Sequence, residues 1–144
     1  MAESTMHVAG ARVLLIDDDL SLHGLVSMML ARAGILATCA ATAVEGRRLL
    51  DEEGFQLLIL DLMLPDVDGF EFLKVLRQDE RFGDLPVLIL SARVDPEAID
   101  RALKLGADGY LTKPYLPQNL NERVTALLAQ RRRQPPPPLL FQEM

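Results

Sequence analysis

Cysteine, aromatic residues and long apolar runs are all scarce in this chain. Its 144 residues include one cysteine, Cys39, no tryptophan and only 5% aromatic residues. A single cysteine excludes an internal disulfide and favours a reducing, cytoplasmic compartment. No apolar run approaches the roughly 18 residues that would span a bilayer, and residues 1–10 lack the basic start and apolar core of a secretory signal. We therefore expect a cytoplasmic protein with no membrane segment.

An excess of basic residues is also absent. The 21 acidic residues outnumber the 15 basic ones, and the formal net charge is −6. Because sequence-independent binding of nucleic acid depends on Lys and Arg that neutralise phosphates, we expect no direct binding of nucleic acid by the domain. The one basic cluster, Arg131–Arg133, is more typical of a helix C-terminus, where cations complement the helix dipole.

The length and the hydrophobic content of 49% suit one well-buried domain and not two. We expect an N-terminal extension over residues 1–10, a folded domain over 11–132 and a proline-rich tail or linker over 133–144. The run Pro135–Pro138 in that tail predicts an extended polyproline segment that rises about 3.1 Å per residue.

Short apolar stretches that end in a polar residue recur along the chain. The clearest is Leu-Leu-Ile-Leu at 57–60, which precedes Asp61. Four apolar residues without alternation are typical of a strand covered on both faces of a parallel sheet. Similar strands are expected at 12–17, 35–40, 86–91 and 109–112.

Helical periodicity separates these strands. Within 20–33, apolar residues follow the spacing of a single buried stripe, formed by Leu22, Leu25, Val26, Met29, Leu30 and Ala33. His23 lies off this stripe and is expected at the surface. Further helix starts are marked by capping residues, at Asp19, Thr42 with Glu45, Asp68, Asp95 with Pro96, and near Pro117.

A strand followed by a helix, five times in succession, predicts an α/β fold with a doubly wound parallel sheet. We expect the flavodoxin-like (βα)5 arrangement with five strands in the order 2-1-3-4-5. Ligands bind such sheets beyond the carboxyl ends of the strands, where the strand order reverses. Here that point falls between the first and third strands, so Asp17 and Asp18 should face Asp61.

The polar residues at the strand ends form one candidate site. Two carboxylates about 4 Å apart repel by about 4 kcal/mol at an effective dielectric constant of about 20, so Asp17, Asp18 and Asp61 together predict a bound cation. Carboxylate ligands favour Mg²⁺ or Mn²⁺. An aspartate can act as a nucleophile and form an acyl phosphate, and Ser91 and Lys113 are suited to contact its phosphate oxygens.

Several motifs in a fixed order resemble the receiver domain of bacterial two-component response regulators, over about residues 10–132. The matching segments are 13–18, 60–69, 86–92 and 106–114. The resemblance implies that Asp61 is the phosphoacceptor. It also implies that Asp17, Asp18, Asp61 and the backbone carbonyl of Met63 bind Mg²⁺.

The resemblance assigns a switch to other residues. Ser91 and Lys113 would move toward the phosphate, which adds roughly −1.5 to −2 charge, and Tyr110 would change rotamer with Ser91. The bond before Pro114 matches the family's cis peptide. The expected partners are a histidine kinase or phosphotransfer protein that supplies phosphate, and an output domain or protein on the face formed by the fourth helix, the fifth strand and the fifth helix. The domain is not expected to be an enzyme beyond catalysing its own phosphorylation and dephosphorylation.

One departure concerns a homodimer. In the family branch joined to winged-helix DNA-binding domains, the output face dimerises through charged pairs. This chain keeps Arg123, but has Ile99, Gly109 and Asn119 where that branch places Lys, Asp and Glu. Because these ion pairs cannot form, we expect no dimer of that kind.

Two alternatives come from other functional classes. A flavodoxin-like binder of a flavin or nucleotide needs a phosphate loop rich in Gly, Ser or Thr after the first strand, where this chain has Asp17–Asp19. A phosphohydrolase with Asp61 as nucleophile would turn over an external substrate. Incubation with a small phosphodonor distinguishes both from a receiver.

Overall fold

The computed structural model describes residues 8–115 and 117–133. Within them, parallel strands form one sheet in the order β2-β1-β3-β4-β5. The strands are β1 Arg12–Ile16, β2 Leu36–Ala40, β3 Leu57–Leu60, β4 Val87–Ser91 and β5 Gly109–Thr112. Both the direction and the order of the strands confirm the fold predicted from the sequence. The proline-rich segment predicted at 135–138 lies outside the described residues.

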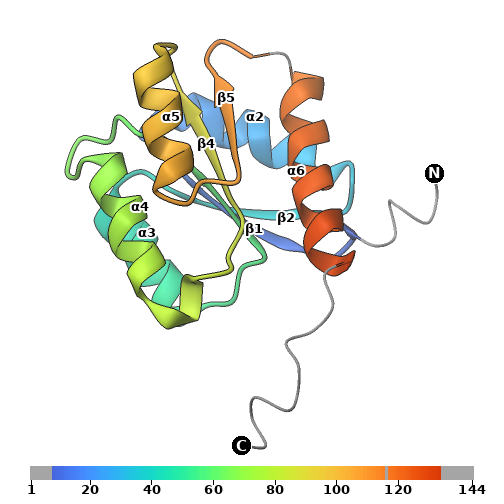
Figure 1. Ribbon diagram of the computed structural model, residues 1–144. Helices are drawn as coiled ribbons and strands as arrows, with labels where there is room; N and C mark the ends of the chain where they lie inside the picture. Colours follow the sequence, from blue (N-terminus) through green and yellow to red (C-terminus); the bar gives the residue numbers. More distant parts are fainter. Residues whose placement is uncertain (1–7, 116, 134–144) are drawn as a thin grey trace, which may run out of the picture.

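Helices cover both faces of the sheet (Figure 1). One face carries α3 Ala43–Glu52, α4 Gly69–Gln78 and α5 Pro96–Lys104, and the other carries α2 Leu20–Ala31 and α6 Pro117–Arg133. Alternate strand residues point to opposite layers: Leu14 packs against the α3–α5 layer and Leu15 against α2 and α6. Two covered faces explain why the strands are apolar throughout.

The stripe predicted on α2 is partly wrong. Val26 and Leu30 are fully buried, but Leu25 is 44% exposed, and Leu22 and Met29 are half-buried. The helix has no charged residue, and Leu20, Leu25 and Met28 are exposed, so the spacing of its apolar residues does not define the buried face. None of the described helices combines the length and apolar character that crossing a bilayer requires.

The predicted caps occupy the helix starts. Asp19, Asp68 and Asp95 are the N-caps of α2, α4 and α5, and each accepts a hydrogen bond from a first-turn N–H. Thr42 caps α3 in the same way, while Glu45 accepts from Ala41 N instead of closing the box on Thr42. These bonds satisfy donors that a helix terminus otherwise leaves unpaired.

Asp66 is a second cap for α3, supplied by the loop after β3. Its two carboxylate oxygens accept hydrogen bonds from Ala43 N and Val44 N, both at 3.0 Å. The bonds from Ala43 and Val44 lower the pKa of Asp66 despite the opposing effect of desolvation. Asp66 follows β3, whereas the helix that it caps follows β2, so the cap joins two different βα units. Asp66 therefore ties the loop that follows Asp61 to the start of α3.

We expect Asp66→Ala to lower the free energy of unfolding by about 1 to 2 kcal/mol, the usual cost of losing a cap. Because the pKa of Asp66 is lowered on folding, its contribution is complete above the ordinary value of 3.8 and is lost as the pH falls through the folded-state pKa. Urea denaturation at neutral and acidic pH measures both effects. Glu80→Ala removes an exposed acid whose side chain makes no hydrogen bond or ion pair within the described residues, and serves as the control. An equal loss in both variants would contradict the cap's role.

Candidate functional site

Three carboxylates meet at the carboxyl edge of the sheet. Asp17 and Asp18 follow β1, Asp61 follows β3, and these strands are neighbours. Asp61 N donates to the carbonyl of Ile16 at 3.0 Å, which joins the two strand ends. One carboxylate oxygen from each acid lies within 4.8 Å of the others. Asp17 is fully buried and Asp61 is 4% exposed, whereas Asp18 faces solvent.

Lys113 reaches this cluster from the far edge of the sheet. Its Nζ lies 2.8 Å from Asp17 Oδ2 and 3.2 Å from Asp61 Oδ2. Its backbone N donates to the carbonyl of Ser91 at 2.8 Å, and its peptide bond to Pro114 is cis. Burial lowers the pKa of Lys113, but the bond to Asp17 and the charges of Asp61 and Asp17 more than offset this, so the pKa is raised overall. The lysine is held as a charged ammonium between two carboxylates.

The negative charge of the cluster exceeds what Lys113 neutralises. Burial raises the pKa of Asp61, and the charge of Asp17 adds to this, while bonds from Met63 N and Lys113 act in the opposite direction without cancelling it. Three carboxylates thus face one ammonium. Oxygen-only donors on a partly solvated edge match the preferences of Mg²⁺ or Mn²⁺, so the residues present fit such an ion.

A closed turn follows Asp61. Met63 N donates to Asp61 Oδ1 at 3.0 Å, Met63 pairs with Asp68 in an antiparallel bridge, and Gly69 N donates to the carbonyl of Leu62 at 3.0 Å. The Met63 side chain is 58% exposed, so the residue contributes to the site through its backbone. The turn holds that backbone beside the carboxylate of Asp61.

Ser91 and Tyr110 lie together around one loop. Ser91 is fully buried at the end of β4, and its Oγ accepts a hydrogen bond from Arg93 N at 3.2 Å. Tyr110 Oη donates to the carbonyl of Arg93 at 2.8 Å. Burial raises the pKa of Tyr110, and a hydrogen bond with Ser91 opposes this. In the described part of the chain, no hydrogen bond joins Ser91 to Asp61, so the loop itself holds the hydroxyl in this arrangement.

The prediction that His23 lies on the surface is wrong. The residue is half-buried, and its Nε2 lies 2.6 Å from the backbone carbonyl oxygen of Asp17. Its spacing relative to the apolar stripe gave no sign of this contact. A usable signal was its position in the first turn of α2, where a side chain can turn back toward the end of β1.

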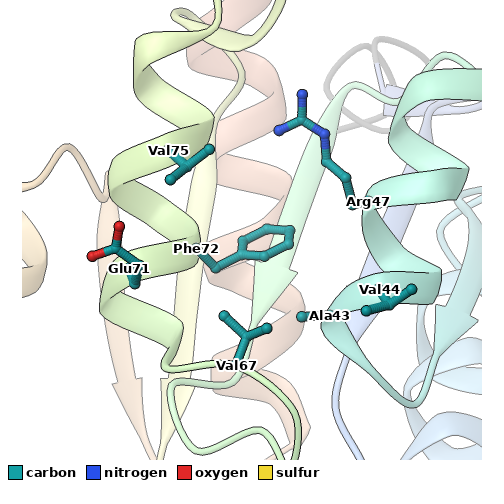
Figure 2. Close-up of a pocket in the computed structure, with 7 residues that line it drawn as sticks. All are labelled: Ala43, Val44, Arg47, Val67, Glu71, Phe72 and Val75. Carbon is teal, nitrogen blue, oxygen red and sulfur yellow. The ribbon is translucent and has the colours of Figure 1, made fainter.

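Two of the cavities among the described elements differ in their relation to the site. One of about 400 Å³ lies between α3 and α4, where Phe72 projects toward α3 and Glu71 points away (Figure 2). None of the predicted site residues lines it. A second cavity of about 430 Å³ opens beside Lys113, between the start of α2 and the loop before α6. The predicted site residues therefore lie at the carboxyl edge of the sheet and not around the α3–α4 cavity.

Comparison with known sequences identifies the family. The model of the response regulator receiver domain matches residues 13–125. The transcriptional regulatory protein GltR of Pseudomonas aeruginosa is 40% identical over 123 residues, which cover 85% of this chain and 51% of GltR. The DNA-binding dual master transcriptional regulator RpaA of Synechocystis is 43% identical over 117 residues, 81% of this chain and 48% of RpaA. The chain thus spans about half the length of these relatives.

Solved structures show the same architecture. The receiver domain of the Francisella response regulator 1452 superposes with a TM-score of 0.79 at 33% identity, covering 85% of this chain and 99% of that one. The chemotaxis response regulator CheY4 of Vibrio cholerae gives a TM-score of 0.77 at 32% identity, covering 81% and 98%. The chain therefore belongs to the response regulator receiver domains, the phosphorylation-dependent signalling switches of two-component systems.

Proposed function

We propose that Asp61 is the phosphoacceptor of this receiver domain, and that Asp17, Asp18, Asp61 and the carbonyl of Met63 hold Mg²⁺ or Mn²⁺ beside it. The observation that carries the proposal is the convergence of three carboxylates and the Lys113 ammonium from three separate strand ends. A structural core has no need of such a cluster, because buried like charges are destabilising unless a ligand compensates them.

In the proposed transfer, an oxygen of Asp61 forms a bond to phosphorus while the donor's bond to phosphorus breaks and its electron pair leaves with the donor. The donor is a phosphorylated histidine of a kinase or phosphotransfer protein, or a small acyl phosphate. Lys113 already contacts Asp61 Oδ2 and is placed to neutralise the transferred oxygens. When bound, the cation would supply further positive charge to the same oxygens.

The proposed switch follows from the bonds around Arg93. When the phosphate attracts the Ser91 hydroxyl, Arg93 N loses its acceptor, and the contact between Tyr110 Oη and the Arg93 carbonyl is released with it. Phosphate then shifts the population of two loop arrangements, which differ on the face formed by α5, β5 and α6. An output domain or protein would read that face. GltR and RpaA are named as transcriptional regulators, and this chain matches about half the length of each.

The ion-paired dimer of the winged-helix branch does not fit this face. Arg123 Nη1 lies 3.4 Å from the carbonyl of Tyr110, and Gly109 and Asn119 offer no carboxylate. We propose that the phosphorylated domain, acting in the cytoplasm, does not form that dimer. Sedimentation of wild type and Arg123→Ala after phosphorylation checks this, because an Arg123-dependent dimer would contradict it.

The decisive experiment is incubation with acetyl phosphate, with and without Mg²⁺, followed by intact mass measurement and peptide mapping. We expect the gain of one phosphoryl group in the peptide that contains Asp61, only when a divalent cation is present. A receiver consumes donor no faster than its own phosphate is lost. Fast multiple turnover of an unrelated phosphate ester would instead support a phosphohydrolase, and no mass gain would contradict the proposal.

A further inference from the structure

The imidazole of His23 is bonded to the backbone that joins the two neighbouring acids. Its Nε2 lies 2.6 Å from the carbonyl oxygen of Asp17. Because a carbonyl oxygen can only accept, Nε2 carries the proton and donates it. His23 comes from the first turn of α2, so this bond connects the helix to the end of β1.

The carbonyl that His23 binds belongs to the peptide unit between Asp17 and Asp18. A peptide unit is planar, so a bond that holds its oxygen restrains the orientation of the whole unit. The two α-carbons that carry the side chains of Asp17 and Asp18 lie in that plane. Asp17 has other restraints: its N–H donates to the Ala40 carbonyl at 3.0 Å, and its Oδ1 accepts from Asp19 N at 2.9 Å. Within the described residues, no hydrogen bond or ion pair holds the side chain of Asp18. Its direction therefore depends on the orientation of the backbone from which it projects.

We propose that His23 is a positioning residue for the cation site, and that it orients the Asp17–Asp18 peptide so that both carboxylates face Asp61. The inference rests on the proposed function, because it assumes that these three acids hold the cation. His23 itself is not a ligand through Nε2, since that nitrogen is occupied by its own proton and the Asp17 carbonyl. It acts on the ion through the backbone, as partners of metal ligands commonly do.

The test compares two substitutions that differ in one property. His23→Leu removes the donor and keeps an apolar side chain, whereas His23→Gln places an amide N–H at a similar reach to Nε2. Mg²⁺ affinity is measured by calorimetry, and the free energy of unfolding is measured in EDTA. We expect His23→Leu to weaken Mg²⁺ binding about tenfold, and His23→Gln to restore most of the loss.

A merely structural role gives a different result. If His23→Leu lowers stability in EDTA but leaves the Mg²⁺ affinity unchanged, the positioning role is wrong. Failure of His23→Gln to restore affinity would also overturn it. Should His23→Leu not fold, nitrogen NMR of the wild-type imidazole still decides: the proposal requires a protonated Nε2 in the metal-free protein, and a proton confined to Nδ1 contradicts it.

Asp18→Asn separates this inference from the function on which it rests. If the wild type binds Mg²⁺ and Asp18→Asn does not, the cation site is supported independently of His23. If the wild type binds Mg²⁺ and His23→Leu binds it with the same affinity, only the positioning role of His23 is wrong. Absence of wild-type Mg²⁺ binding would remove the proposed site and the role of His23 together.

Discussion

Asp61→Asn is expected to abolish phosphorylation by acetyl phosphate and, in the absence of divalent cations, to raise the free energy of unfolding. The amide cannot form the acyl phosphate. The other buried carboxylate that contacts Lys113 is Asp17, and it belongs to the acidic pair. Stability should rise because burial and the charge of Asp17 raise the pKa of Asp61, so its ionised form is unfavourable at neutral pH. Lys113 keeps Asp17 as its partner in the variant.

The pH dependence of this gain has a definite sign. A carboxyl whose pKa is raised on folding binds its proton more tightly in the folded state, so ionisation destabilises the wild type as the pH rises above the ordinary value of 3.8 and through the folded-state pKa. The stability difference between Asp61→Asn and wild type should therefore widen from acidic to neutral pH. Urea denaturation in EDTA over this range measures it, with Glu80→Gln as a surface control.

Two outcomes would contradict the argument about Asp61. A phosphoryl mass gain retained in Asp61→Asn would move the phosphoacceptor to another residue. A stability difference that narrows as the pH rises would mean that the charged carboxylate is stabilising in the folded state.

Gly69→Ala is expected to destabilise the fold by about 3 kcal/mol, at the upper end of the usual cost of overpacking. Gly69 begins α4 directly against the loop that follows Asp61. A Cβ added at this glycine would lie 2.4 Å from Leu62 Cα and 2.7 Å from the Leu62 carbonyl oxygen. These are backbone atoms, so no side-chain rotation relieves the overlap and the loop itself must move. Because Met63 lies in that loop, Mg²⁺ binding should weaken as well.

Gly24→Ala is the matched control for this substitution. Gly24 lies inside α2, and an added Cβ would have no heavy atom within 4 Å. There the change should stabilise the protein by up to about 1 kcal/mol, because alanine favours a helix more than glycine does. Thermal and urea denaturation of both variants give the comparison. Equal effects at the two positions would show that the close approach of Gly69 to Leu62 is unimportant.

The sheet was predictable because its signal is local. Uninterrupted apolar runs at 57–60 and 87–90 indicate strands covered on both faces, and the caps Asp68 and Asp95 mark where helices begin. Parallel strands joined by helices then bring their carboxyl ends to one edge. For this reason the meeting of Asp61 with the acidic pair was predicted together with the strand order.

Predictions for α2 were less successful for a physical reason. Because α2 carries no charged residue, no charged face marks its solvent side, and the exposure of Leu25 depends on how the helix is rotated against the sheet. The same rotation turns His23 toward the end of β1. Neither outcome follows from spacing within the helix, because it depends on the surface that the helix packs against.

The sequence by itself determined the parallel sheet, the helix starts and the acids at the strand ends, since each depends on neighbouring residues or on a regular period. Only the tertiary structure decided that Asp66 caps α3, that His23 binds the carbonyl of Asp17, and that Ser91 is held by Arg93. The first two are hydrogen bonds between different elements, two for Asp66 and one for His23, and such bonds leave no periodic trace in the chain. The third depends on the path of a loop that the packed elements on either side define.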